Sequence, residues 1–433
     1  MSSFTIGVIG ILVVLLLLFW GFPIGFSMAL VGYVGVWYLV NPTAAFHVVA
    51  TEPFNAISSY DFQVIPLFLL AASICLSAGL GRSLLRLAYN LVGRLPGGLA
   101  MSTIGACGLF AAISSSSIAT AVTIGTAAIP EMRSYKYDSA LATGCVAAGG
   151  TLGILIPPSG IFIIYGIITE TSIAELFVAG IIPGIILTLM FMSLIYIRAR
   201  LKPQIGPPGP ATSLKEKLVA FGECAEIMLL ILLVLIGIIV GWFTPTEAGG
   251  IAAFGSIVVT LIRRRLSWQG FKDAIVDTVL NTGMIFMVLI GALIMNTFIA
   301  MSTIPMELAE IVTSFGLPPV LVVGLIICVY LVLGCLIDTM SMILLTIPIF
   351  FPVVTGLGFD PIWFGVIIVL VTEIAMITPP IGMNVYVISG VAKDVPMEVI
   401  FKGILPFVVV EIAFVILLIT FPQLALFLPG LMK

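Results

Sequence analysis

The sequence predicts an all-α membrane protein that crosses the bilayer many times and is built from two inverted-topology repeats. Three observations support this fold class. First, 61% of the 433 residues are apolar and 9% are charged, whereas about 25% of residues are charged in an average soluble domain. Second, apolar runs of about 20 residues, the length of a bilayer-spanning helix, recur along the chain. Third, unusual residues of the first half recur in the second. This composition excludes a soluble enzyme, a disordered protein and a nucleic-acid binder.

The internal repeat has an offset of 222 residues, which is visible in the rarest residue types. The offset places Trp20 on Trp242, and Pro157–Pro158 on Pro379–Pro380. After one inserted residue near the end of each half, the offset becomes 223. Tryptophans and proline pairs are too rare for so long a register to arise by chance, so the two halves are predicted to share one architecture.

Each repeat contains seven apolar segments. In the first repeat, residues 1–200, they lie near 4–20, 22–40, 62–80, 98–112, 116–130, 138–168 and 175–198. The fourth and fifth segments are too short to cross a bilayer, so we expect a re-entrant helical hairpin at 98–130. The other five are predicted full spans, of which 138–168 is broken by its Pro-Pro pair. Because each repeat crosses an odd number of times, the second must be inverted relative to the first.

The second repeat, residues 223–433, is predicted to have the same order, with a hairpin at 320–352 and a broken helix at 361–391. Residues 201–222 are charged and rich in proline, which predicts an exposed cytoplasmic linker. Residues 263–282 place Trp268, Phe271 and Ile275 on one helical face beside basic residues. This pattern is typical of an amphipathic arm on the inner leaflet, and a plain connecting helix explains it equally well.

The basic residues predict the orientation of the chain. With the N-terminus outside, all of the 17 Lys and Arg residues except Lys433 fall in inside loops, as the positive-inside rule requires. We therefore expect periplasmic termini, a first hairpin that enters from the cytoplasm and a second that enters from outside. The first residues lack the basic region of a signal peptide, so the first apolar run is a predicted span.

Few residues are suited to metal, haem or nucleotide chemistry. The six cysteines, Cys335 among them, form no CxxC pair and are expected to pack as small apolar side chains. The single histidine, His47, is expected in a loop, which disfavours an intramembrane enzyme. Gly149–Gly153 is not followed by the Lys-Ser/Thr of a P-loop. The sequence shows no ring of residues suited to line an open pore, which disfavours a channel.

The two Pro-Pro pairs indicate the depth of a binding site. A proline in a helix leaves the carbonyl four residues earlier without its hydrogen bond. The pairs should therefore free the carbonyls of Gly153, Ile154, Ala375 and Met376. Within lipid such groups need a partner, and a cation at the C-terminal end of the first half-helix is one. The N-terminus of the second half-helix favours an anion. The alternative is a structural kink that neighbouring helices relieve.

The hairpin tips carry oxygen atoms at the same predicted depth. The first tip is Ser114–Ser117, and the second is Gly334–Thr339, in which Asp338 aligns with Ser116. Hard cations take such oxygen ligands, although serines also bond their own helix backbone. A carboxylate in a membrane hairpin is costly and functional by default. We therefore expect Asp338 to bind a cation or to lie beside one.

Three further polar residues fall within predicted spans. Glu373 lies one turn before the second Pro-Pro pair, and it is a candidate for direct cation binding or for a buried structural contact. Glu411 lies in the middle of the last span, where a structural hydrogen bond is expected. Asn384 follows the second break and is a candidate donor to an anionic substrate.

Four segments resemble a known family. ILIPPSGIFIIYG (154–166), ITPPIGMNVYVISG (377–390), GWFTPTEAGG (241–250) and LGCLIDTMSMILLTIPIFFP (333–352) are similar to the large membrane subunit of tripartite ATP-independent periplasmic (TRAP) transporters, over essentially the whole chain. The resemblance implies Na⁺-coupled uptake of organic acids across the bacterial inner membrane by an elevator-type transport domain held in a scaffold with arms. It implies two partners, a soluble periplasmic substrate-binding protein and a small membrane subunit of four helices. Nothing precedes residue 1, so that subunit is expected to be a separate chain.

The resemblance also implies site residues at the hairpin tips and broken helices. The implied Na⁺ ligands are Ser114, Ser116, Gly153, Ser159, Gly334, Asp338, Thr339, Glu373, Thr378 and Gly382. The substrate contacts expected are Ser115, Ser117, Pro158, Pro380 and Asn384. No cofactor besides the coupling ion is expected. The anion is left open between a dicarboxylate, a sialate, a keto acid and a sulfonate. The alternative function is a stand-alone anion/Na⁺ symporter or Na⁺/H⁺ exchanger that needs no soluble protein.

Overall fold

The computed structural model describes residues 1–210, 212–334 and 336–432, together with every side chain in these ranges except that of Thr313. The positions expected for Cys335 and Lys433 lie outside the described residues. Across the described ranges the chain is helical and contains no β-strand. Within these ranges, six helices are long and apolar enough to cross a membrane, or eight if each of two bent pairs is one span. The all-α membrane fold is therefore confirmed.

The first repeat begins with helices that are separated by short turns. Its helices are α1 (Ser3–Phe19), α2 (Ile24–Leu39), α3 (Pro42–Ser58), η1 (Asp61–Gln63), α4 (Val64–Ser77), α5 (Leu80–Val92), α6 (Gly98–Ser114), α7 (Ser117–Ser134), α8 (Ser139–Leu155), α9 (Gly160–Thr169) and α10 (Ile173–Leu201). After η2 (Pro203–Ile205), the second repeat has α11 (Leu214–Ile239), α12 (Pro245–Ile262), α13 (Trp268–Met301), α14 (Ile304–Ser314), α15 (Pro319–Leu333), α16 (Thr339–Gly356), α17 (Pro361–Ile377), α18 (Met383–Val391), α19 (Met397–Thr420) and α20 (Gln423–Gly430).

Helix boundaries repeat with the same offset as the sequence. Helices α7 and α16 differ by 222 at both ends, and so do α8 and α17. Their caps correspond as well, because Ser116 caps α7 where Asp338 caps α16, and Asp138 caps α8 where Asp360 caps α17. A side-chain oxygen at an N-cap accepts a free backbone N–H of the first turn, which fixes where the helix begins.

One difference between the two repeats lies before the hairpins. In the first repeat α3 meets the helix pair η1–α4 at a bend of 60°, whereas α13 runs through the corresponding region as one helix of 34 residues. The segment 263–282 accordingly forms the turn after α12 and the first part of α13. The expectation that His47 lies in a loop is wrong, because it lies within α3. Asn41 starts that helix by accepting a hydrogen bond from Ala44 N (2.8 Å), with Pro42 at the first helical position.

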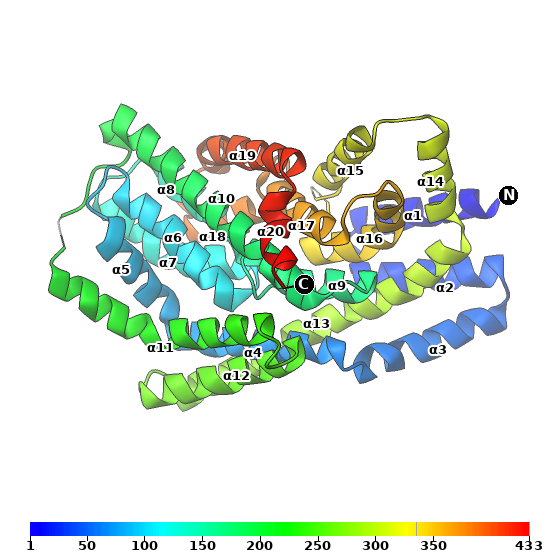
Figure 1. The fold of residues 1–433 in the computed structure, drawn as a ribbon, viewed down its shortest axis with the longest axis horizontal. Coiled ribbons are helices and arrows are strands. Elements are labelled where there is room, and N and C mark those ends of the chain that lie inside the picture. The colour runs from blue at the N-terminus through cyan, green and yellow to red at the C-terminus, as the bar shows by residue number, and fades with distance from the viewer. Residues whose placement is uncertain (211, 335, 433) are drawn as a thin grey trace.

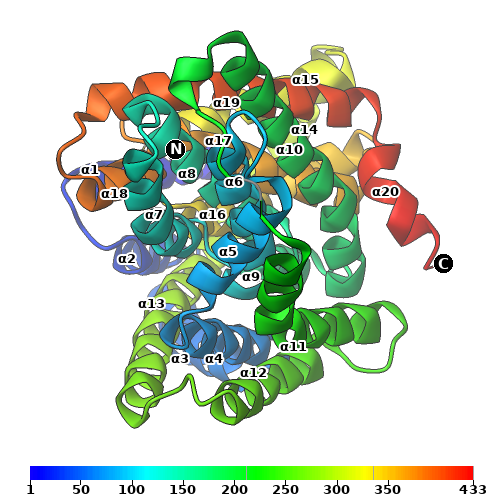
Figure 2. The same ribbon diagram turned by 90° about the vertical axis from the view of Figure 1, so that its left-hand side faces the viewer.

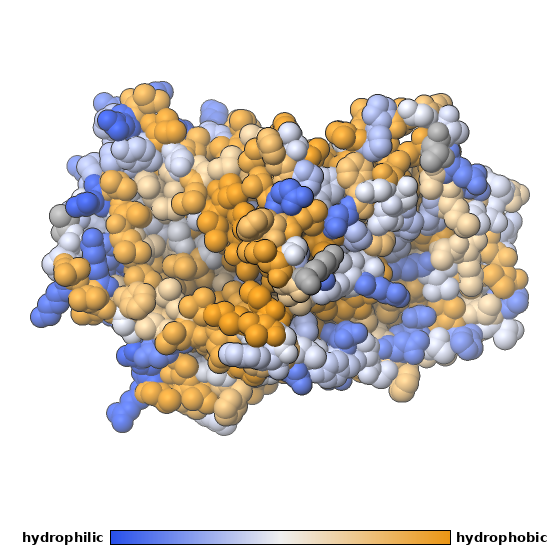
Figure 3. Space-filling view, in the orientation of Figure 1, coloured by the Kyte–Doolittle hydropathy of each residue, from blue (hydrophilic) through white to orange (hydrophobic). Residues whose placement is uncertain are grey.

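The helices form two layers. In Figures 1 and 2, α3, α4, α11, α12 and α13 lie along the lower side, and the hairpins and broken helices lie above them. The lower layer is held by contacts of α4 with α12 and α13. Large apolar side chains such as Phe254 (71% exposed) remain on the surface. Figure 3 shows apolar residues covering much of one face, as expected for a protein that lipid surrounds.

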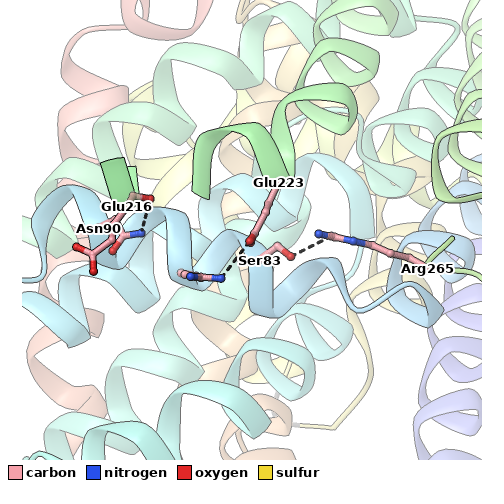
Figure 4. Close-up of polar contacts among 6 residues, drawn as sticks. Ser83, Asn90, Glu216, Glu223 and Arg265 are labelled. Atoms are coloured by element: carbon pink, nitrogen blue, oxygen red, sulfur yellow. Dashed lines mark hydrogen bonds and ion pairs between the residues drawn. The ribbon is translucent and has the colours of Figure 1, made fainter. Parts of the chain in front are cut away.

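Helix α5 connects the first hairpin to the lower layer through polar contacts with α11 and the turn after α12 (Figure 4). The Arg86 guanidinium pairs with the Glu223 carboxylate at 3.0 Å. Arg265 Nη1 donates to Ser83 Oγ at 3.1 Å, and Asn90 Nδ2 donates to the Glu216 carbonyl at 3.3 Å. The side chains of Arg86 and Glu223 are 57% and 27% exposed, so the pair orients α5 more than it stabilises the protein.

The linker between the repeats is shorter and more firmly bound than the segment 201–222 expected from the sequence. Helix α10 extends to Leu201, and α11 already begins at Leu214. Between them Gly206 is buried. The Gly206 carbonyl accepts from Gly97 N (2.9 Å), and Gly209 N donates to the Gly93 carbonyl (3.0 Å). The linker therefore lies along the base of the first hairpin.

Replacing Tyr137 by Phe should destabilise this base. The Tyr137 hydroxyl accepts from Leu99 N (3.1 Å) and donates to the Pro207 carbonyl (2.9 Å). Because Leu99 is buried, the variant leaves an N–H without a partner, which costs about 1–3 kcal/mol. Thermal unfolding in detergent should show a lower midpoint, whereas Tyr38→Phe, at a side chain 69% exposed, should unfold like wild type. Equal midpoints for both variants would contradict this role of the hydroxyl.

Candidate cation and substrate site

The hairpin of each repeat packs against the broken helix of the other repeat. Helix α9 of the first repeat contacts α16, and α18 of the second repeat contacts α7. An ion pair of 2.6 Å between Arg133, at the end of α7, and Asp394, just after α18, fastens one of these crossings. The hydrogen bond from Arg133 lowers the pKa of the Asp394 carboxyl. Both hairpins and both breaks therefore belong to one packed unit.

The first break separates α8 from α9 by a bend of 40°. Its peptide bond Pro157–Pro158 is cis. No described residue donates a hydrogen bond to the carbonyls of Gly153 and Ile154, which agrees with the effect expected of the prolines. Ser159 is fully buried, and its hydroxyl accepts from Phe162 N at 3.5 Å as the N-cap of α9.

The second break differs from the first in how its carbonyls are used. The peptide bond Pro379–Pro380 is also cis. The expectation of a free Ala375 carbonyl is wrong, because Thr378 donates to it from its N–H (3.4 Å) and its hydroxyl (3.2 Å). Gly382 precedes α18 with a φ of 55°, a left-handed conformation that glycine adopts without a steric cost.

The tip of the first hairpin lies directly on the first break. Ser115 Oγ donates to the Pro158 carbonyl at 2.8 Å. Ser114 Oγ lies 2.6 Å from Thr120 Oγ1, and Ser116 Oγ accepts from Ala119 N at 3.2 Å. A Cβ on Gly153 would lie 2.6 Å from the Ser116 carbonyl oxygen. Gly153 is therefore required sterically, and most of the tip hydroxyls already have protein partners.

The tip of the second hairpin places Asp338 at the start of α16. One carboxylate oxygen accepts from Ser341 N (3.2 Å) and the other from Ser341 Oγ (2.5 Å). The residue is half-buried, which leaves the carboxylate accessible. A Cβ on Gly334 would lie 2.2 Å from the Cβ of Ala375, so this hairpin also packs beside its own broken helix. Asp338 thus has a structural role as a cap and retains a charge that a cation can neutralise.

Three polar residues near the breaks are fully buried. Glu411 accepts from Thr151 Oγ1 at 2.7 Å, which is the structural hydrogen bond expected for it. The Asn384 amide donates to the Ala147 carbonyl on α8 at 3.5 Å, so it contacts the other repeat. Glu373 is fully buried on α17, and neither of its carboxylate oxygens has a hydrogen-bond partner among the described residues. Of the remaining predicted substrate contacts, Pro158 is buried and Pro380 is exposed.

The space around the first tip is small. A cavity of about 30 Å³ lies between Ala112, Ile113 and Pro158 on one side and apolar residues of α4, α11 and α12 on the other. That volume holds a water molecule or two, and it is too small for an organic anion. A polar cavity of about 820 Å³ lies at the base of the hairpin, beside Arg82, Asn90 and Glu131. Burial raises the pKa of the Glu131 carboxyl.

Comparison with known proteins decides the family. The model of the tripartite ATP-independent periplasmic transporter DctM component matches residues 11–424. The chain belongs to this family. Among DctM relatives, the C4-dicarboxylate TRAP transporter large permease protein of Pseudomonas aeruginosa is 36% identical over 88% of this chain and 89% of its own. The sialic acid TRAP transporter large permease protein of Vibrio cholerae is 32% identical over 96% of each chain.

Two solved structures share the fold at low sequence identity. The YdaH transporter of Alcanivorax borkumensis is 14% identical, with a TM-score of 0.58 over 86% of this chain and 89% of its own. MtrF of Neisseria gonorrhoeae is 15% identical, with a TM-score of 0.60 over 88% of this chain and 84% of its own. The chain is thus a multi-pass membrane protein of a bacterial transporter family, and its relatives are named as permeases.

Three polar residues of the region were not predicted from the sequence. Thr120 contacts the Ser114 hydroxyl, Ser341 contacts Asp338, and Thr151 contacts Glu411. Only Thr151 has a signal in the sequence, because the offset of 222 residues places it on Glu373. The other two contacts depend on local helix geometry at the tips.

Proposed function

We propose that this DctM-family chain is the permease of a Na⁺-coupled importer for a small organic anion. A soluble periplasmic binding protein delivers the anion, and a small membrane subunit completes the complex in the bacterial inner membrane, with both termini of this chain in the periplasm. Printed names of relatives support an anionic cargo, since they include C4-dicarboxylate, sialic acid and isethionate permeases. A Vibrio cholerae relative, named for C4-dicarboxylate, is 34% identical over 98% of this chain.

One observation carries the proposal, the hydrogen bond that joins the first hairpin tip to a Pro-Pro break. Ser115 Oγ and the Pro158 carbonyl are 2.8 Å apart. Beside this contact, the carbonyls of Gly153 and Ile154 end α8 without a donor from the described residues, and they offer negative ends to a cation. The N-terminus of α9 follows within five residues and favours an anion. Cation and anion therefore bind side by side and move together.

The two-layer architecture supports an elevator mechanism. The packed unit of hairpins and broken helices meets α4, α11 and α12 through apolar side chains around Ile113 and Phe68. This contact is apolar and lacks directional hydrogen bonds, whereas the polar contacts with the lower layer are made by α5, which precedes the first hairpin. The unit can therefore slide along the lower layer. In this mechanism the unit carries ions and substrate across while the lower layer stays fixed.

The membrane potential sets how many cations the cycle needs. Moving one charge through 100 mV is worth about 2.3 kcal/mol, so carrying a dianion into a negative cell costs about 4.6 kcal/mol. Two Na⁺ cancel that charge, and the repeat supplies two matched places for them. The proposal is therefore at least two Na⁺ per anion.

Reconstituted proteoliposomes test the coupling. Chain, small subunit and cognate binding protein are assayed with labelled succinate, N-acetylneuraminate and isethionate under an inward Na⁺ gradient. We expect uptake of one of these anions, with its loss when K⁺ replaces Na⁺ or when the binding protein is omitted. Uptake that is independent of both the Na⁺ gradient and the membrane potential overturns the proposed coupling. Uptake without the binding protein supports a stand-alone symporter instead.

A further inference from the structure

The polar cavity at the base of the first hairpin is separate from the hairpin tips, and we call it the base cavity. Its volume is about 820 Å³, within the range of about 300–1,000 Å³ that small-ligand sites occupy. Its walls come from α5, from α7 and from the segment that leads into α11. In α7, the cavity residue Glu131 lies 14 residues after Ser117 of the tip, which is about 21 Å along a helix.

Two charged side chains in the wall of the base cavity already have structural partners. The Arg86 guanidinium pairs with the Glu223 carboxylate at 3.0 Å. One carboxylate oxygen of Glu216 accepts from Ser213 N (2.6 Å) and lies 2.9 Å from Ser213 Oγ, at the start of α11. These two side chains therefore hold α5 and α11 in place.

Two further charged side chains of opposite sign, Arg82 on α5 and Glu131 on α7, line the same cavity. Neither belongs to an ion pair in the ranges that the structure describes. Tyr89, also in the wall, has a buried hydroxyl without a hydrogen-bond partner among those residues. An available cation, an available acid and a donor suit a ligand that carries both charges. A dicarboxylate or a sulfonate would pair with Arg82 and leave Glu131 without a partner.

These charges are particular to the first repeat. The offset of 222 residues places Arg82 on Ile304 and Glu131 on Val353, although α7 and its mate α16 have matching boundaries. The shared fold therefore does not need charge at these positions. The positive-inside rule accounts for an arginine here but not for a glutamate. The pair of opposite charges thus points to a function at one membrane surface.

Helix α5 has the character of a helix at the membrane surface. It joins α4 to the base of the first hairpin, and it is amphipathic, with Leu84 and Leu87 buried and Arg82 exposed. Amphipathic helices of this kind lie at the level of the lipid headgroups. Figure 1 places α5 at the left-hand end of the molecule, where Figure 3 shows hydrophilic residues. The base cavity is therefore within reach of a headgroup.

We propose that the base cavity binds a phosphoethanolamine group, with its phosphate on Arg82 and its ammonium on Glu131. A guanidinium pairs with phosphate in a bidentate geometry, and basic pockets at this depth take lipid headgroups. Phosphatidylethanolamine of the surrounding leaflet carries this group, and so does the free phosphate ester. Because α5 is fastened to the lower layer and α7 belongs to the packed unit of hairpins, the ligand joins the two layers and stabilises the folded chain. The inference does not depend on Na⁺ coupling, so either can fail without the other.

Thermal unfolding of the full-length chain in detergent with added lipid tests the proposal, because a ligand of the folded state raises the midpoint. Dioleoylphosphatidylethanolamine should raise the midpoint most. The matching phosphatidylcholine has no N–H to donate, and the matching phosphatidylglycerol has no ammonium, so both should raise it less. Equal shifts with the three lipids, without any shift from free phosphoethanolamine, overturn the proposal. A shift with the free ester as large as that with the lipid assigns the site to a soluble ligand, and no shift with the free ester assigns it to the lipid.

Charge variants test which side chains bind the group. Arg82→Gln and Glu131→Gln should each abolish the extra shift from phosphatidylethanolamine. Because both side chains hold one ligand, the double variant should lose no more than either single variant. Arg94→Gln and Glu398→Gln are the matched controls, since both residues are exposed and lie outside the cavity wall. The controls should keep the wild-type shift, and its loss in them as well would overturn the site in favour of general charge attraction.

A variant that fills the cavity decides the question if the charge variants fail to fold. Ala127 lies in the cavity wall on α7 and is partly exposed, so Ala127→Phe places a ring in the cavity and keeps both charges. It too should abolish the extra shift from phosphatidylethanolamine. A wild-type shift in Ala127→Phe means that the group binds elsewhere, and the base cavity is then not its site.

Discussion

Asp338→Asn is expected to reduce Na⁺-driven uptake to background while the protein still folds. In the wild type, Ser341 N donates to a carboxylate oxygen of Asp338 at 3.2 Å. Asparagine also caps helices, so its side-chain oxygen can replace the carboxylate as this acceptor. What the variant loses is the negative charge at the tip of the second hairpin. Without it, a cation at this tip has only neutral ligands and binds weakly. Uptake in proteoliposomes and Na⁺-dependent thermal stabilisation measure the two consequences.

Asp360→Asn is the matched control for this charge. Asp360 also caps a helix of the second repeat, by accepting from Ile362 N at 2.8 Å, and it lies away from the tips and breaks. The control should transport like wild type. Ser116→Ala, at the repeat mate of Asp338, should lose about 0.5–2 kcal/mol of stability through its cap. Wild-type uptake in Asp338→Asn would remove this carboxylate from the mechanism.

Gly403→Ala is expected to have the largest effect on stability. A Cβ at this position of α19 would lie 1.9 Å from the Ala140 carbonyl oxygen of α8. Because the obstacle is backbone, no side-chain rotation relieves it, and the two helices must separate. We expect a loss of about 2–3 kcal/mol, seen as a lower midpoint of thermal unfolding and a lower yield of monodisperse protein.

Gly324→Ala is the control for the glycine itself. Gly324 lies within α15, and a Cβ there would meet nothing within 4 Å. This variant should be neutral or slightly more stable, because alanine favours a helix over glycine by about 0.5–1 kcal/mol. Equal stability of the two variants would show that α8 and α19 separate without cost, contrary to the close crossing.

The sequence predicts the hairpins and broken helices well because their ends are marked by residues with strong local preferences. Asp138 and Asp360 cap helices that begin at the next residue, and the Pro-Pro pairs end α8 and α17 within three residues. Such signals act locally and need no tertiary context. The bend between α3 and α4 was not predictable in this way, because the offset pairs it with a continuous helix.

The details of the site depended on contacts between distant segments. The hydrogen bonds of Ser115 with Pro158 and of Thr151 with Glu411 join segments that are far apart in the sequence. The spacing of residues along the chain does not show which of these segments pack together. Similarly, four serines at one tip predicted oxygen ligands, but three of the hydroxyls have partners in the protein. Residue types were thus informative about chemistry, and packing determined which atoms remain available.

The contrast between bent α3–α4 and continuous α13 has a consequence for the balance of the transport cycle. If two inverted halves were perfectly matched, exchanging their conformations would convert the outward-open state into an inward-open state of equal free energy, related to the first by a two-fold rotation. Here one half contains a 60° bend and the other a continuous helix, so such an exchange no longer returns an identical molecule. This degeneracy is therefore lifted, and the empty permease has a preferred resting side.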